Sequence, residues 1–202
     1  MPHRLIFLLA PLLLVAPLLG AAAAETGPKA IVETFHANLL AVMKEAQDLG
    51  SRGRYQRLSA PVVTAFNLGH TLRIATGSFW RRASPAQKGA LTEAFTRMTI
   101  STYASQFDGF SGQVFEILGE RAGPGRTKLV ATRIISPAKG AVGLTYVVEK
   151  TPRGWQIVDI LLGDDISQLA VRRSEYRGVL RRGGIEALIS DLNRKAEQLI
   201  AE

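Results

Sequence analysis

Hydrophobic residues recur at helical spacing through the first half of the chain and at alternate positions through much of the second half. Between Pro28 and Gly50 an apolar residue returns at every third or fourth position, which predicts one amphipathic helix that stops at Gly50. Residues 51–83 keep the helical spacing but carry several helix breakers. We therefore expect shorter helical pieces there, broken at Gly53, Pro61, Gly69 and Gly77.

The tetrapeptide Ser84-Pro85-Ala86-Gln87 marks a sharp helix start. It combines a Ser N-cap, a Pro at the first helical position and a Gln that completes a capping box. We expect this helix to run to about Phe107. Its apolar side chains fall on two nearly opposite sides, which indicates a helix that is sandwiched between other elements or lines something apolar. The main stripe holds Leu91, Ala94, Phe95, Met98 and Thr102, and the opposite side holds Ile100 and Phe107.

From Gly112 onward the hydrophobic period changes to two, and the segments are rich in β-branched and aromatic residues. Short turns separate the segments, so we expect an antiparallel meander. Two further helical segments, Asp164–Arg182 and Ile185–Ile200, follow the last strand. This order predicts an α+β fold, with helices packed on one face of a sheet of about four strands. The predicted strands are Gln113–Glu120, Thr127–Ile135, Ala141–Lys150 and Trp155–Leu162.

The start of the chain has the three parts of a secretory signal peptide. Residues 1–4 are basic, residues 5–20 are almost wholly apolar, and small alanines precede a cleavage site after residue 24. We expect residues 1–24 to be removed, which leaves residues 25–202, enough for one domain. An uncleaved anchor fits less well, because two prolines interrupt a run shorter than the ~20 apolar residues of a spanning helix. The chain has no Cys, which excludes disulfides and a lipoprotein anchor.

The chain is basic, with 25 Lys and Arg residues against 17 Asp and Glu residues. Such a balance suits nucleic acid, an anionic membrane surface or an acidic protein partner. The basic residues are dispersed apart from a few Arg-Arg pairs, and aromatic residues do not alternate with them as a nucleic-acid stacking platform requires. Export also argues against nucleic acid, so we expect transient contact with an anionic membrane surface or with protein partners.

The sequence shows no catalytic or metal-binding constellation. His36 and His70 lie in helical regions and at no metal-ligand spacing, and we expect each to be a surface or capping residue. Asp164 and Asp165 stand just before a helix, where we expect them to cap it rather than to bind a metal or transfer a proton. We therefore predict no catalytic residue, no metal and no cofactor, as in a binding protein.

One charged residue interrupts an apolar face of the helix after the last strand. At helical spacing this face carries Arg173 among Ile166, Leu169, Ala170, Tyr176 and Leu180. An unpaired guanidinium there would cost on the order of several kcal/mol, so Arg173 needs a partner. Asp159, which interrupts the apolar last strand, is the expected partner in a structural ion pair. Direct binding of an anionic head group by Arg173 is the alternative.

Three segments of the chain resemble a known family. They are FWRRASPAQKGALTEAF at 79–95, WQIVDILL at 155–162 and DISQLAVRRSEYRGVLRRGGIEALISDL at 165–192. They resemble the MlaC, or toluene-tolerance, family of periplasmic lipid-binding proteins, and the resemblance covers nearly the whole mature chain. Family members typically have Gly just before the hydrophobic-Ser step. This chain has Asp165 there, in the manner of the hopanoid-biosynthesis-associated HpnM branch.

The resemblance implies a fold similar to NTF2-like and cystatin-like proteins, with an apolar cavity between sheet and helices that holds lipid acyl chains. It also implies a shuttle that carries hopanoid or phospholipid through the periplasm between membrane transport complexes at the inner and outer membranes. The apolar faces described above fit such a cavity, although a single apolar residue more often belongs to ordinary core. The residues expected to line the cavity are Phe66, Leu72, Phe79, Leu91, Phe95, Met98, Val130, Tyr146, Val148, Val158, Ile160, Ile166 and Leu169.

Two other functions remain open from the sequence. An enzyme of the NTF2-like kind would use a pocket acid such as Asp108 or Asp159 on a small apolar substrate. A scaffold of a hopanoid-synthesis complex would use the same fold without a cargo. The missing histidine relay, the signal peptide and the family resemblance favour the carrier.

Overall fold

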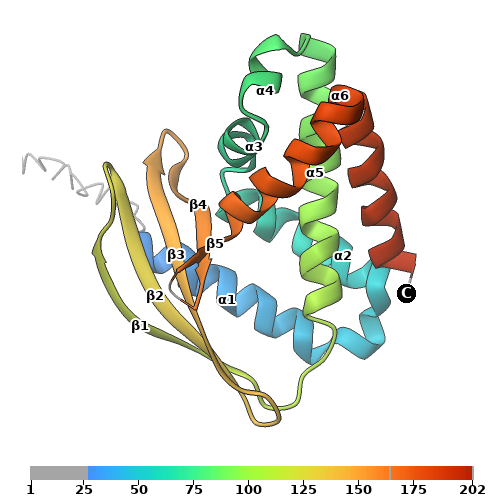
Figure 1. Ribbon diagram of the computed structural model, residues 1–202. Helices are drawn as coiled ribbons and strands as arrows, with labels where there is room; N and C mark the ends of the chain where they lie inside the picture. The colour runs from blue at the N-terminus through green and yellow to red at the C-terminus, as the bar shows by residue number, and fades with distance from the viewer. Residues whose placement is uncertain (1–26, 164, 202) are drawn as a thin grey trace, which may run out of the picture.

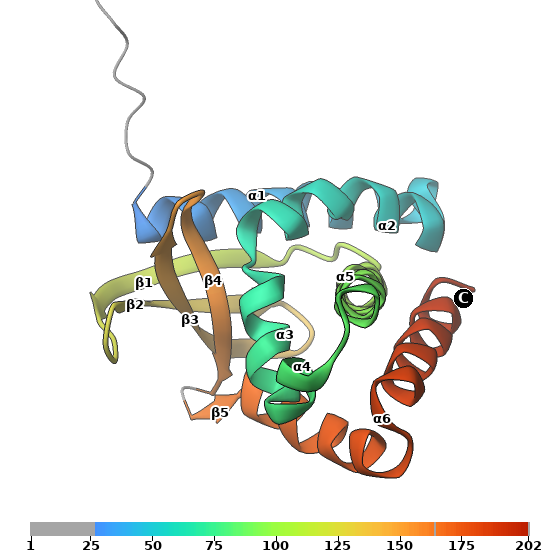
Figure 2. The same cartoon turned by 90° about the horizontal axis from the view of Figure 1, so that it is seen from above.

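The computed structural model describes residues 27–163 and 165–201 (Figure 1). The predicted signal peptide, residues 1–24, and Asp164 lie outside the described residues. A strongly curved sheet forms one side of the molecule and helices form the other side (Figures 1 and 2). The predicted α+β fold, with helices against one face of an antiparallel sheet, is confirmed.

The first half of the described chain is helical, as predicted, but its breaks differ from the predicted ones. The first helix ends before Gly50, and Gly50 is instead a kink inside the second helix, with φ of 58°. Gly53 and Pro61 do not end a helix, because burial of Leu58 and Val62 in the core stabilises the helix through both positions. The helices are α1 (Pro28–Lys44), α2 (Ala46–Ala65), α3 (Leu68–Thr76), α4 (Ser78–Arg82) and α5 (Pro85–Gln106).

A contact with a distant strand fixes the break after α2. Phe66 forms a short parallel bridge with Ile157, and the Asn67 N–H donates a hydrogen bond of 2.9 Å to the Ile157 carbonyl oxygen. The helix therefore ends before Gly69, which lies inside α3 and does not break it. Gly77 does separate α3 from α4, as predicted, and it has φ of 56°.

The predicted capping box is present at the start of α5. The Gln87 N–H donates to the Ser84 hydroxyl oxygen at 3.1 Å, and the Ser84 N–H donates to the Gln87 side-chain oxygen at 2.9 Å. Figure 2 shows α5 standing between the sheet and the second segment of the C-terminal helix. Leu91 and Ile100 are both buried although they lie on different sides of the helix. The prediction of a sandwiched helix is confirmed.

Five antiparallel strands form the sheet in the order β1-β2-β3-β4-β5. The predicted meander is confirmed, because each strand pairs with its neighbour in sequence through a short link. Pairing shifts by one residue between Ile117 and Gly119 and between Val147 and Val148, and such bulges sharpen the bend of a sheet. The strands are β1 (Val114–Ala122), β2 (Thr127–Ser136), β3 (Gly140–Thr151), β4 (Gly154–Leu162) and β5 (Ile166–Ser167).

The last helix, α6 (Gln168–Ala201), begins later than predicted. Ile166 pairs with Leu162 in β5, so the residues that directly follow the last long strand extend the sheet by one short strand before the helix starts. Non-helical backbone at Gly183 and Gly184 divides α6 into two segments, close to the predicted division of this region into two helices.

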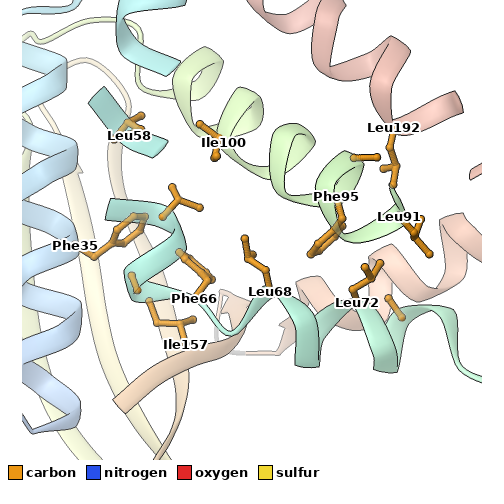
Figure 3. Packing of buried hydrophobic residues seen from close by; sticks show 14 of the residues in the cluster. Phe35, Leu58, Phe66, Leu68, Leu72, Leu91, Phe95, Ile100, Ile157 and Leu192 are labelled. Atoms are coloured by element: carbon orange, nitrogen blue, oxygen red, sulfur yellow. The ribbon is translucent and has the colours of Figure 1, made fainter. Parts of the chain in front are cut away.

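Sheet and helices share one apolar core. Figure 3 shows Phe35, Phe66 and Ile157 close together at one end of it, and Phe95 and Leu72 toward the other end. The core therefore holds α1, α2, α3 and α5 against the sheet. None of the described helices is both long and apolar enough to cross a membrane.

Candidate functional site

A cavity of about 450 Å³ lies between the inner face of the sheet and the helices. Strands β2 to β4, helices α1 and α5, the junction of α2 and α3, and the first two turns of α6 form its walls. Two exposed charged residues, Asp108 after α5 and Lys139 in the β2–β3 turn, lie on its lining. The apolar lining residues are Met43, Phe66, Leu68, Phe95, Phe107, Ile134, Val142, Leu144, Val158, Ile160, Leu162 and Leu169.

The two-residue period of the strands builds the sheet side of the cavity. Val142, Leu144 and Tyr146 alternate along β3, so their side chains point to the same face. Antiparallel pairing places Tyr146 opposite Ile160 of β4 and Leu144 opposite Leu162. One continuous apolar surface results from two neighbouring strands.

Aromatic rings form a second wall. The ring centroids of Phe66 and Tyr103 are 5.6 Å apart, and those of Tyr103 and Phe107 are 5.9 Å apart with nearly parallel planes. Phe115 of β1, which is not among the lining residues, packs against Phe107 with ring centroids 6.2 Å apart. Such ring pairs are favourable contacts, so this wall is a continuous aromatic surface that also carries the Tyr103 hydroxyl.

Tyr146 places its hydroxyl in a buried hydrogen bond behind the cavity wall. The His36 Nε2 atom lies 2.9 Å from the Tyr146 hydroxyl oxygen, and the His36 ring packs on Phe115 with centroids 4.5 Å apart. Burial lowers the pKa of His36 to about 4 and raises the pKa of Tyr146 well above its usual value. Both side chains are therefore neutral near pH 7. His36 is thus a core residue and not the surface or capping residue predicted from the sequence.

Arg172 brings a half-buried guanidinium to the cavity wall. Its Nη1 atom donates a hydrogen bond of 3.2 Å to Oγ1 of Thr99, and its guanidinium carbon lies 5.1 Å from the centroid of the Phe95 ring. Burial raises the pKa of Tyr176, and the neighbouring charge of Arg172 partly offsets that rise. Among the described residues, no carboxylate lies within ion-pair distance of Arg172. The cavity wall thus contains a cation without a counter-ion from the described chain.

Asp159 connects β4 with the start of α6. Its Oδ2 atom accepts a hydrogen bond of 2.6 Å from the Ser167 hydroxyl, and its Oδ1 atom accepts one of 2.9 Å from the Leu169 N–H. The Ser167 oxygen accepts the Ala170 N–H at 2.9 Å. A carboxylate of the neighbouring strand and a serine therefore cap the helix. The predicted cap by Asp165 is wrong, because Asp165 is exposed and precedes β5.

The predicted ion pair between Arg173 and Asp159 is wrong. Arg173 is exposed, and the Asp159 oxygens accept hydrogen bonds from Ser167 and from backbone amides. The prediction counted Ile166 as helical, although it belongs to β5, and this shifted the expected inward face of the helix. Because successive helical residues differ by about 100°, Arg173 points away from that face. The inward face carries Leu169, Arg172 and Tyr176.

The predicted cavity residues divide into three groups. Those that line the cavity are Phe66, Phe95, Tyr146, Val158, Ile160 and Leu169. Those that are fully buried in close-packed core are Leu72, Leu91, Val130 and Val148. Of the remaining three, Phe79 packs at the edge of the core, Met98 faces the last turns of α6, and Ile166 is exposed. The hydrophobic period identifies buried faces, but it does not tell whether a buried face meets packed atoms or a cavity.

Sequence reasoning missed the polar groups of the cavity. The role of Arg172 can be recognised only once the start of α6 is known. With that start, Arg172 lies on the same inward face of the helix as Leu169 and Tyr176. Tyr103 follows Thr99 by one helical turn and so lies on the same side of α5. Among residues 27–163 and 165–201, no group of three His, Asp or Glu side chains has the arrangement of metal ligands.

The sequence profile of the MlaC family, described as MlaC protein, matches residues 33–194. Among solved structures, the chain is similar to the phospholipid-binding protein from Ralstonia solanacearum in complex with a phospholipid, with a TM-score of 0.75. The two chains share 26% sequence identity, and the similarity covers 87% of this chain and 99% of that chain. The profile match includes every wall of the cavity, from Met43 on α1 to Arg172 on α6. By its sequence and its fold, the chain belongs to the MlaC family.

Proposed function

We propose that this protein is a carrier that holds the acyl chains of a lipid in its cavity. The observation that carries the proposal is an apolar cavity of about 450 Å³ in a member of the MlaC family. This volume lies within the ~300–1,000 Å³ of ligand pockets in proteins. The phospholipid held by the similar Ralstonia protein supports a lipid as the ligand.

Such a carrier has to shield the acyl chains of its lipid from water. Each methylene that moves from water to an apolar surface contributes about 0.8 kcal/mol of favourable free energy. A lipid that crosses an aqueous compartment without a carrier therefore faces a large free-energy barrier. The cavity replaces water around the chain with aliphatic and aromatic side chains. Because hydrophobic burial is non-directional, we expect selectivity for the length and saturation of the chain to be weak.

We place this carrier in the periplasm, as a shuttle between membrane transport complexes at the inner and outer membranes. The signal-peptide pattern of residues 1–24 and the family support this location. Phospholipid is the first cargo to test. Hopanoid is the second, and it rests on the resemblance to the HpnM branch at Asp165.

The arrangement of the two candidate acids favours a carrier over an enzyme. Asp159 accepts hydrogen bonds from Ser167 and from backbone amides that start α6, so its carboxylate has a structural role. Asp108 is exposed after the end of α5, where a carboxylate meets water.

The test uses residues 25–202 purified from the protein's own host without detergent. Lipid extraction followed by mass spectrometry is expected to yield about one lipid per protein, and the protein is expected to transfer fluorescent phospholipid between vesicles. A secreted protein of similar size from the same host serves as the control. No lipid above this control, together with no transfer, would contradict the proposed function.

A further inference from the structure

Two side chains on the cavity wall carry N–H or O–H groups that have no acceptor among the described residues. Arg172 has five N–H donors, of which the Thr99 hydroxyl accepts one and the Tyr176 hydroxyl is placed to accept another, so at least three are left for a ligand. The described residues offer the Tyr103 hydroxyl no hydrogen-bond partner, although Tyr103 lines the cavity. Thr99 and Tyr103 are one turn apart on α5, so the two donors belong to the same side of the cavity.

The charges around the cavity leave this cation unbalanced. Besides Arg172, the charged lining residues are Asp108, Lys139 and Asp159. Asp159 accepts hydrogen bonds from Ser167, Ile160 and Leu169, and Asp108 and Lys139 are exposed. The Arg172 cation, by contrast, lies over the buried Phe95 ring, where water screens charge weakly.

We infer that Arg172, with Tyr103 beside it, binds the oxyanion of an amphiphilic ligand inside the cavity and so selects anionic lipids over neutral ones. The planar guanidinium presents parallel N–H donors that match a phosphate or a carboxylate, and the Tyr103 hydroxyl adds one neutral donor. Apolar tails then fill the space against the aromatic wall and strands β3 and β4. This inference rests on the proposed function and names the chemical class of its cargo.

The experiment compares lipid pairs that differ only in charge. Delipidated protein, residues 25–202, is titrated with phosphatidic acid and with diacylglycerol of the same acyl chains, and separately with oleate and with oleyl alcohol. We expect the wild type to bind each anionic member about 10-fold or more tightly than its neutral partner, as a charge-assisted hydrogen bond in a poorly solvated site provides. The two pairs separate phosphate from carboxylate as the preferred oxyanion.

Three variants test the assignment to Arg172. Arg172→Gln is expected to abolish the preference, because affinity for the anionic lipid of each pair should fall about 10-fold relative to its neutral partner. Arg173→Gln, a change at the exposed next residue, is the matched control and is expected to keep the preference. Tyr103→Phe removes only the hydroxyl and is expected to reduce the preference without abolishing it. Circular dichroism shows whether each variant is folded, and Arg172→Met, which also removes the charge, replaces Arg172→Gln if that variant does not fold.

The outcomes distinguish this inference from the proposed function. Equal affinities for charged and neutral lipids in the wild type, or a preference that survives in Arg172→Gln, would overturn the inference and leave the carrier intact. Binding of neither lipid would contradict the carrier itself. Inorganic phosphate is expected to leave the melting temperature unchanged. A stabilisation by phosphate as large as that by phosphatidic acid would assign the site to a free anion instead of a lipid.

Discussion

His36 is uncharged inside the core because burial disfavours its protonated form. Its ring lies between Phe115 and the Tyr146 hydroxyl, and burial lowers its pKa from 6.5 to about 4. In the unfolded chain the same side chain takes up a proton near pH 6.5. The folded state therefore keeps its full stability from this residue above pH 6.5 and loses it as the pH falls toward 4.

We predict that His36 makes the protein sensitive to acid. Between pH 6.5 and pH 4, the free energy of unfolding should fall by up to ~3 kcal/mol through His36, in addition to the effect of other groups. Urea unfolding across this range, compared between wild type and His36→Phe, isolates the contribution. Tyr146→Phe keeps the buried histidine and should retain most of the slope. Parallel curves for wild type and His36→Phe would contradict the prediction.

Some roles of single residues are predictable from the sequence, and others are not. Ser84 and Gln87 predicted their own capping box, because both partners lie within one helical turn. Arg172 and Arg173 are chemically identical neighbours, and the choice between them depends on the start of α6. Asp159, on another strand, fixes that start. No local pattern contains this information.

Hydrogen bonds from the start of α6 to Asp159 of β4 take the place of the predicted ion pair between Arg173 and Asp159. Asp159→Ala removes the acceptor of the Leu169 N–H and of the Ser167 hydroxyl, and we expect a loss of about 2–4 kcal/mol in the free energy of unfolding. Ser167→Ala should cost ~1 kcal/mol. Because the two side chains share a hydrogen bond, the double variant should cost less than the sum. Urea unfolding measures all three.

The control for this prediction is Asp165→Ala, at an exposed carboxylate before β5. Its stability should stay within about 0.5 kcal/mol of wild type, as is usual for a surface change. A loss at Asp165 as large as that at Asp159 would mean that carboxylates near the helix start act through their charge alone and not through hydrogen bonds.

A second prediction concerns the division of α6 into two segments. Gly184 has φ of 65° and ψ of −159°, a region that side chains with a Cβ atom strongly disfavour. Gly184→Ala is therefore expected to cost about 1–3 kcal/mol of stability. Gly178 lies in the helical part of α6, so Gly178→Ala should be neutral or stabilising. Thermal unfolding measures the melting temperatures of both variants. Equal melting temperatures would contradict the prediction that position 184 requires glycine.

The sequence predicted the elements and the ends of the strands better than the ends of the helices. Strand boundaries agreed closely because turns such as Thr151-Pro152-Arg153-Gly154 are local signals. The end of α2 did not agree, because Ile157 fixes it through a bridge to Phe66 across many residues of chain. Local propensity predicts what a segment forms, whereas tertiary contacts decide where it stops.

At the scale of the whole molecule, we predict that filling the cavity blocks lipid without unfolding the protein. Leu144 lines the cavity on β3, so Leu144→Trp adds volume where no side chain packs. Lipid recovered with the purified protein should fall several-fold, and the melting temperature of the delipidated protein should change little. Leu118→Trp, at the exposed bulge of β1, is the matched control and should keep its lipid.

A different result would place Leu144 in ordinary core. In a close-packed site the same enlargement costs about 1–3 kcal/mol. A large drop in melting temperature with no selective loss of lipid would therefore contradict the cavity. The sequence alone did not settle this point, since Val148 and Tyr146 share one face of β3 and only Tyr146 borders the cavity.

The cavity also has a mechanical consequence. Its volume of about 450 Å³ equals that of roughly 15 water molecules at ~30 Å³ each. Hydrostatic pressure favours states that eliminate internal voids, so the empty protein should unfold at pressures that the lipid-filled protein withstands. The fluorescence of Trp155, which packs against the core, reports this transition in a pressure cell. Loading then appears as a difference in molar volume, and it is measurable before the chemical identity of the cargo is known.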